Sequence, residues 1–207
     1  MRNFTKWLDE IGIFDFNEVG GKNASLGEMY SNLSSEKINI PNAFVLTANS
    51  YNTFIKFNDL EKNIKILLSS IDTGDIISLR EKAKVIREQI SNGTMPSDLY
   101  NEIIDQYSNL SKQYLGENVD VAVRSSSTAE DLPDASFAGL QETFLNVRGE
   151  EYLIQSIKDC FASLYTDRAI SYRKTMNYDN DVTISVCIQK MVRSDMGSAG
   201  VAFSIDS

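Results

Sequence analysis

VAVRSSSTAEDLPDASFAG, residues 121–139, begins with the apolar pattern of a strand, presents one arginine, Arg124, and continues as a long polar loop. The next stretch, QETFLNV at residues 141–147, again has strand character. Two strands joined by so long a connection indicate a functional loop, because long structureless loops are uncommon inside compact domains. We therefore expect Arg124 to contact either a ligand or a carboxylate of the chain itself.

The rest of the chain mixes helical and strand patterns. Helical spacing of apolar residues recurs at residues 21–33, in several pieces over 48–114, near 153–164 and at 169–176. Short apolar runs typical of strands lie at residues 42–47, 182–192 and 199–206, the last two expected side by side. This order predicts an α+β fold with helices packed on a mostly antiparallel sheet. In the first helix we expect Leu26, Met29 and Leu33 to face the core.

The composition is that of a folded domain. The 207 residues are 42% hydrophobic, which suffices for one substantial domain or two small ones. No apolar run approaches a membrane span, and the first residues, MRNFTKWLDE, lack the features of a signal peptide. We therefore predict a cytoplasmic protein with no membrane partner. Cys160 and Cys187 lie among apolar residues and are expected to be free thiols of the core.

The chain contains no histidine and has a formal net charge of -9. The first fact excludes a Ser/His/Asp or Cys/His catalytic arrangement and a histidine-ligated metal within this chain. The second argues against a nucleic-acid partner, because such binding needs a positive surface. A bound anion would therefore need local basic residues or a cation.

The segment VGGKNASLGEM, residues 19–29, suggests a phosphate-binding interpretation. Glycines at a helix start let backbone N–H groups approach an anion, and Lys22 would add a positive charge. The segment is not a Walker A loop, because Phe16 stands where that loop needs a glycine and Asn23 where it needs Ser or Thr. Taken alone, it is more typical of a helix start with a solvated lysine.

Arg124 also has two interpretations. Its planar guanidinium suits phosphate oxygens, but it could equally form an ion pair with the acidic loop that follows. Gly139 permits close backbone approach to a ligand or forms a simple turn, and Thr143 could donate its hydroxyl or fill a strand. The loop carboxylates could hold Mg²⁺, although a solvated acidic loop is the commoner outcome and the one we expect. They are Glu130, Asp131 and Asp134.

The end of the strand at 182–192 carries Gln189, Met191 and Val192. Such an edge can offer backbone hydrogen bonds and apolar cover to an adenine ring, and core packing explains Met191 and Val192 equally well. Farther back, Arg168 and Arg173 are expected to be ion-paired helix residues and not phosphate ligands.

Four segments, in this order, resemble the amino-terminal nucleotide-binding part of the phosphoenolpyruvate synthase and pyruvate phosphate dikinase family, which also contains rifamycin phosphotransferase. They are VGGKNASLGEM, VAVRSSSTAEDLPDASFAGLQETFLNV, FASLYTDRAISYR and MVRSDMGSAGVAFSID, the last of which is more similar to the synthases. The resemblance implies an ATP-grasp fold, in which two subdomains clamp ATP. It also implies a parent enzyme that phosphorylates a carrier histidine with ATP and passes the phosphoryl group to pyruvate. Phosphoenolpyruvate, AMP and phosphate are the products.

The resemblance implies seven nucleotide contacts in this chain: two phosphate ligands, two residues of a covering loop and three hinge residues beside adenine. They are, in that order, Lys22 and Arg124; Gly139 and Thr143; and Gln189, Met191 and Val192. For Lys22 this reverses the preference for a solvated side chain. Mg²⁺ is the expected second cofactor, with ligands outside this chain.

The resemblance covers nearly the whole chain but only part of such an enzyme. It implies that residues 1–192 form the first ATP-grasp subdomain and that 193–207 begin the connection to a second one. The carrier histidine, the pyruvate-binding barrel and the second subdomain are not in this sequence. We therefore expect a piece of a longer protein that binds ATP weakly, has no catalytic residue and is inactive alone. Two alternatives stay open: the same half of a rifamycin phosphotransferase, and a stand-alone nucleotide-binding module.

Overall fold

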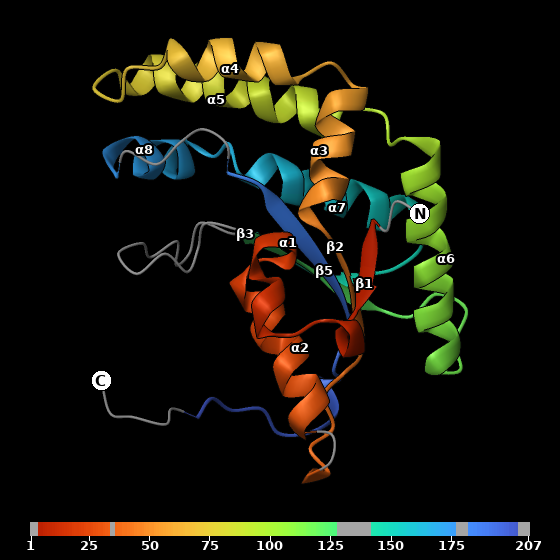
Figure 1. Cartoon of the computed structure of the whole chain (residues 1–207). Coiled ribbons are helices and arrows are strands. Elements are labelled where there is room, and N and C mark those ends of the chain that lie inside the picture. The colour runs from red at the N-terminus through yellow and green to blue at the C-terminus, as the bar shows by residue number, and fades with distance from the viewer. Residues whose placement is uncertain (1–3, 34–35, 128–141, 177–181, 203–207) are drawn as a thin grey trace.

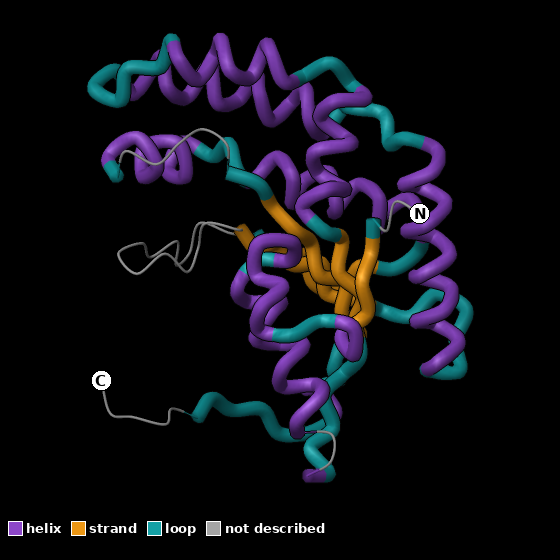
Figure 2. The backbone as a smooth tube through the Cα atoms, viewed as in Figure 1, coloured by secondary structure: helices purple, strands orange, loops and turns teal. Residues whose placement is uncertain are grey.

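The structure, a computed structural model, describes residues 4–33, 36–127, 142–176 and 182–202. Within these ranges an antiparallel sheet lies in the middle and helices pack on both of its faces (Figures 1 and 2). The strands are β1 (Thr5–Trp7), β2 (Ala43–Leu46), β3 (Val121–Ser127), β4 (Thr143–Val147) and β5 (Ile184–Lys190). The helices are α1 (Phe16–Val19), α2 (Gly21–Leu33), α3 (Ala48–Phe57), α4 (Glu61–Ser69), α5 (Ile76–Ser91), α6 (Ser97–Gln113), α7 (Glu150–Ser163) and α8 (Asp167–Thr175). Short 3₁₀ helices include Leu8–Glu10, Ile13–Asp15 and Ser194–Met196.

The sheet has the strand order β1-β2-β5-β3-β4, and every neighbouring pair is antiparallel. The α+β class, the antiparallel sheet and the strand pair on either side of the long loop are thus confirmed. The strand predicted at 199–206 is wrong for its described part, because residues 199–202 form no strand. The central strand β5 is hydrogen-bonded to β2 on one side and to β3 on the other, so it has no free edge with which a further strand could pair.

Alternate residues of the central strands face two different hydrophobic clusters. On one face, Phe44, Val186 and Ile188 belong to the main core, together with side chains from helices α3 to α8. On the other face, Val45 and Cys187 join a smaller cluster beside α2. Because successive side chains of a strand point to opposite faces, a strand covered on both faces is apolar throughout, as AFVL of β2 is.

The long helices show the apolar spacing that the sequence predicts. The buried residues of α5 are Leu79, Ala83, Ile86 and Ile90, and those of α6 include Leu99, Ile103, Tyr107 and Leu110. Residues three and four apart lie on one face of a helix, and here that face packs in the main core. None of the helices in the described ranges is long and apolar enough to span a membrane.

The buried residues of helix α2 are small or polar and do not belong to the predicted stripe of Leu26, Met29 and Leu33. They are Asn23, Ala24 and Gly27. Glycine is required at position 27, because a Cβ there would lie 2.5 Å from the carbonyl oxygen of Ile11. This close contact turns the opposite side of the helix outward, and Met29 is 44% exposed. The expectation that Met29 faces the core is therefore wrong, whereas Leu26 is partly buried and packs against the smaller cluster.

Candidate functional site

A cavity of about 390 Å³ lies between the first turns of α2 and the strand pair β3–β4. Its lining brings together segments that are far apart in the sequence. The lining residues are Gly21, Lys22, Asn23, Ser25, Leu26, Met29, Arg124, Ser125 and Thr143. Three of the predicted site residues, Lys22, Arg124 and Thr143, therefore meet around one cavity.

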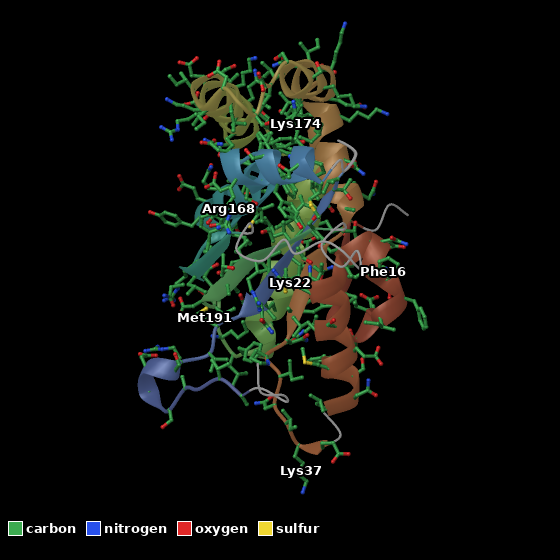
Figure 3. All side chains as sticks on the ribbon, turned by 90° about the vertical axis from the view of Figure 1, so that its left-hand side faces the viewer. Phe16, Lys22, Lys37, Arg168, Lys174 and Met191 are labelled. Carbon is green, nitrogen blue, oxygen red and sulfur yellow. The ribbon has the colours of Figure 1, made fainter. Side chains whose placement is uncertain are left out.

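Lys22 is the second residue of α2, which starts at Gly21. The first N–H groups of a helix have no carbonyl partner within that helix, and the helix dipole makes this end positive. The exposed Lys22 side chain adds a full charge there, and Figure 3 shows it near the middle of this face of the molecule. The α2 side of the cavity is thus positive and suits an anion.

Gly20, just before α2, lets the helix start lie directly on β3. Its φ of +74° and ψ of 157° belong to a region that only glycine occupies readily. A Cβ at this position would lie 2.4 Å from Oγ of Ser126 and 3.0 Å from the carbonyl oxygen of Ser127. The small side chain at Ser126 is therefore explained by packing, because it leaves room for the turn that presents Lys22.

One wall of the cavity was missed by the sequence reasoning. Ser25, Leu26 and Met29 follow Lys22 at three, four and seven positions, which is the spacing of a single helix face. This signal was present in the sequence, but it also predicts a core stripe. The apolar side chains therefore line the cavity that Lys22 borders, where they can cover an uncharged part of a ligand.

Arg124 enters the cavity from β3 and lies opposite Thr143 in the β3–β4 register. Its Nη1 donates a hydrogen bond to Oε1 of Gln189 at 3.3 Å. Among the described residues Arg124 forms no ion pair, and Gln189 is the side chain to which it donates a hydrogen bond. Because a guanidinium carries five N–H donors, Arg124 keeps donors for an anionic ligand.

Gln189 supports Arg124 from the neighbouring strand. Its Oε1 accepts from Arg124, and its Nε2 donates to the carbonyl oxygen of Pro41 at 3.1 Å. Both ends of this amide are therefore engaged within the chain, and Gln189 is not part of the cavity lining. In this structure Gln189 orients Arg124, and its expected contact with a nucleotide stays a prediction.

Met191 and Val192 lie beyond the end of β5 and outside the cavity lining. Figure 3 shows Met191 to the left of Lys22 and slightly below it. The backbone N–H of Met191 donates to the carbonyl oxygen of Asp120 at 2.9 Å, and Nζ of Lys190 donates to the Met191 carbonyl at 2.9 Å. The Val192 side chain is 60% exposed. The structure does not bring these two residues to Lys22, and the hinge assignment also stays a prediction.

Thr143, which the resemblance assigns to the covering loop, is instead the first residue of strand β4. Gly139 and the carboxylates Glu130, Asp131 and Asp134 lie outside the described residues, so the predictions for them stay as they were. In the ranges that the structure does describe, no three Cys, Asp or Glu side chains gather closely enough to hold a metal ion.

The two cysteines are buried free thiols, as predicted. Burial raises the pKa of the Cys187 thiol to about 12, and the positive charge of Arg124, its partner in the β3–β5 register, acts in the opposite direction. Burial likewise raises the pKa of Cys160 well above its usual value. A thiol with a raised pKa is a poor nucleophile at neutral pH. We therefore assign Cys187 to the packing of the sheet beside the cavity and give it no catalytic role.

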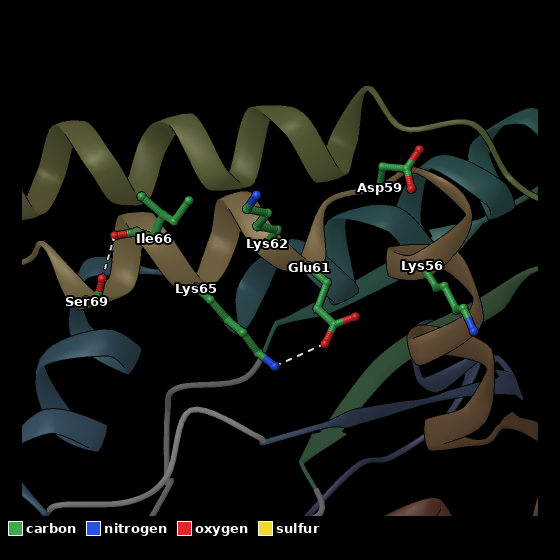
Figure 4. A pocket seen from close by; sticks show the side chains of 7 residues that line it. All are labelled: Lys56, Asp59, Glu61, Lys62, Lys65, Ile66 and Ser69. Carbon is green, nitrogen blue, oxygen red and sulfur yellow. Dashed lines mark hydrogen bonds and ion pairs between the residues drawn. The ribbon is translucent and has the colours of Figure 1, made fainter.

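A larger hollow of about 830 Å³ lies on the outside of the molecule along α4 and the end of α3 (Figure 4). Its walls come from one continuous segment, residues 56–69, and its charged groups include the ion pair between Lys65 and Glu61 at 3.0 Å. Binding sites usually combine polar groups from several elements with apolar cover. We therefore place the candidate site at the smaller cavity, where α2, β3 and β4 converge.

Arg173 does not form the ion pair expected of it with any residue that the structure describes. Its side chain is buried, with 5% of the residue exposed, and its guanidinium lies 5.6 Å from the ring centre of Tyr165. Burial lowers the pKa of Arg173, while the nearby hydroxyls of Tyr165 and Tyr51 act in the opposite direction. The arginine therefore belongs to the packing of α8 and lies apart from the cavity of Lys22.

Comparison with known proteins adds an independent observation. Residues 16–207 match the family model described as "Pyruvate phosphate dikinase, AMP/ATP-binding domain". The chain is 53% identical over 202 residues to a phosphoenolpyruvate synthase of Aquifex aeolicus, covering 97% of this chain and 24% of that protein. It is 49% identical over 205 residues to the synthase of Helicobacter pylori, with coverage of 99% and 25%. For the Escherichia coli synthase the identity is 46% over 202 residues, with coverage of 97% and 25%. The chain thus spans about a quarter of the length of these curated relatives.

Proposed function

This chain belongs to the pyruvate phosphate dikinase AMP/ATP-binding domain family, and from that premise we propose that the cavity between α2 and β3 binds the phosphates of ATP. The observation that carries the proposal is the meeting of Lys22 and Arg124, from distant parts of the sequence, at the positive end of a helix. The chain as a whole has a net charge of -9, so two basic side chains at one cavity are a local departure from its overall charge. Binding of an anionic ligand explains this departure.

The chemistry of the lining fits a polyphosphate. The first N–H groups of α2 and the Lys22 ammonium offer donors on one side, and the planar fork of Arg124 offers paired donors on the other. Thr143, opposite Arg124 in the strand register, can add a hydroxyl. Phosphoryl transfer needs positioning and charge neutralisation more than covalent chemistry from the protein, and these groups supply both. We assign Gly139 to the covering loop and Gln189, Met191 and Val192 to the adenine side as part of the same proposal.

Magnesium does not fit the described lining. Mg²⁺ prefers carboxylate and water oxygens, whereas the described lining presents an ammonium, a guanidinium and neutral groups but no carboxylate. We therefore propose that Mg²⁺ accompanies the nucleotide and takes its protein ligands from a part of the longer protein outside this chain.

For the longer parent protein we propose the activity of its relatives. The relatives named above are phosphoenolpyruvate synthases, and we propose that the parent makes phosphoenolpyruvate, AMP and phosphate from pyruvate, ATP and water. The reaction would pass through a phosphohistidine, and this chain contains no histidine. We therefore propose that the chain is one part of an ATP-grasp clamp and has no activity alone. Incubating the full-length parent with pyruvate and ATP tests this: AMP and phosphoenolpyruvate are expected, and ADP as the only nucleotide product would contradict it.

The phosphate assignment is tested by calorimetry of ATP and Mg²⁺ binding to the wild-type chain and to Lys22→Met and Arg124→Gln. Because a charge-assisted hydrogen bond contributes about 1.5–3 kcal/mol, each variant should bind ATP about 10- to 100-fold more weakly. Lys62→Met is the matched control, since it removes an exposed lysine charge from the larger hollow in Figure 4 and should leave affinity unchanged. Equal affinity in all four proteins would exclude the phosphate site.

A further inference from the structure

A buried polar cluster lies directly beneath the first turn of α2. Asn23, the residue after Lys22, is 4% exposed, and its side-chain Nδ2 donates to the carbonyl oxygen of Val19 at 2.9 Å and to Oγ of Ser185 at 3.0 Å. A buried amide is costly unless it is hydrogen-bonded. These two bonds therefore tie the helix start both to the end of α1 and to the central strand β5.

Ser185 is the centre of this cluster. It is fully buried in β5, opposite Ser126 of β3 in the register. Its hydroxyl accepts from Asn23 and can donate to the carbonyl oxygen of Val19 or, at 3.1 Å, to that of Ser126. One hydroxyl thus joins the end of α1, the start of α2 and strand β3.

The same cluster links the two proposed phosphate ligands. Ser126 lies two positions after Arg124 on β3, so both side chains are on the face of the sheet that α2 covers. Lys22 is next to Asn23 at the start of α2. Ser185 therefore accepts a hydrogen bond from the residue after Lys22 and lies within hydrogen-bond distance of the carbonyl oxygen of Ser126, two positions after Arg124, although it does not line the cavity itself.

We infer that Ser185 is a positioning residue that acts through Lys22. Its hydroxyl holds the first turn of α2 at a set place on β3, so that Lys22 and Arg124 contact the same anionic group. An alanine at position 185 would leave the Asn23 amide and the Val19 carbonyl oxygen each short of one buried partner, and the helix start would lose its attachment to the strand. This inference rests on the proposed binding of ATP phosphates by Lys22.

The experiment is a double-mutant cycle on this chain, with ATP and Mg²⁺ binding measured by calorimetry. Ser185→Ala should weaken binding about fivefold, the equivalent of one hydrogen bond. In the Lys22→Met background the same change should weaken binding less than about twofold, because the residue through which it acts is gone. If Ser185→Ala does not fold, Ser185→Cys carries the same comparison, since a thiol has a similar shape and is a weak hydrogen-bonding group.

A control distinguishes positioning from general destabilisation. Ser163→Ala removes another buried hydroxyl, one that donates to the Cys160 carbonyl oxygen at 2.7 Å in α7, away from the cavity. It should lower stability to urea by a similar amount and leave ATP affinity unchanged. If the effects of Ser185→Ala and Lys22→Met simply add, the positioning role is excluded while the proposed function stands. If Lys22→Met binds ATP as tightly as the wild type, the positioning role through Lys22 is excluded, and the phosphate site is excluded as well only if Arg124→Gln also binds like the wild type.

Discussion

Replacing Gly20 with alanine tests whether the small side chain of Ser126 in β3 makes room for the turn before α2. Gly149 offers a matched comparison, because its backbone has nearly the same conformation. The φ and ψ angles are 74° and 157° at Gly20 and 84° and 158° at Gly149. The two glycines differ in their surroundings. A Cβ at Gly149 would meet no atom within 4 Å, whereas one at Gly20 would lie 2.4 Å from Oγ of Ser126.

The magnitudes follow from this geometry. A non-glycine residue in such a backbone conformation costs about 1–3 kcal/mol, and both variants bear this cost. Overpacking a well-packed site adds about 1–3 kcal/mol, and only Gly20→Ala bears it. We therefore expect Gly20→Ala to lower the free energy of unfolding by about 1–3 kcal/mol more than Gly149→Ala does.

Urea unfolding followed by fluorescence measures both variants. Trp7 is the single tryptophan and packs 5.8 Å from the ring of Phe44, so its emission should report loss of the sheet. In a Ser126→Gly background the closest contact is gone, and the difference between the two glycine variants should fall to about 1 kcal/mol or less. Equal losses for Gly20→Ala and Gly149→Ala in the wild-type background would refute the packing role of Ser126.

Three further outcomes follow from buried groups. The unfolded Cys187 thiol ionises near pH 9 while the folded one has a pKa of about 12, so stability should fall by up to about 1.4 kcal/mol per pH unit in that window. Cys187→Ala should reduce this slope in urea unfolding at pH 8, 9 and 10, and parallel slopes would count against it. Ser126→Ala should raise stability by about 1 kcal/mol, because its buried Oγ has no hydrogen-bond partner among the described residues, and a clear loss would contradict this. Tyr51→Phe should cost about 1–2 kcal/mol by leaving the Tyr165 hydroxyl, now 2.6 Å from that of Tyr51, without its partner. The double change to phenylalanine should cost no more than the single one, and additive losses would exclude this reasoning.

Much of the fold follows from local patterns in the sequence. The two strands on either side of residues 128–141, the fully buried β2 and the stripes of α5 and α6 are all placed correctly, because period and length distinguish strands from helices. The stripe of Leu26 and Met29 has the same helical period, yet it lines the cavity. Periodicity groups residues on one face of a helix but does not say which face meets the sheet.

For the candidate site, too, the sequence predicted some features and the tertiary structure decided others. The sequence by itself determined the chemistry available: no histidine, a lysine after a glycine pair, and one arginine at a strand with small residues behind it. Only the tertiary structure decided that Lys22, Arg124 and Thr143 share a cavity, while Gln189 supports Arg124 from outside it. The reason is physical: these proximities depend on strand order and on the approach of Gly20 to Ser126, and both arise from contacts between residues distant in the sequence.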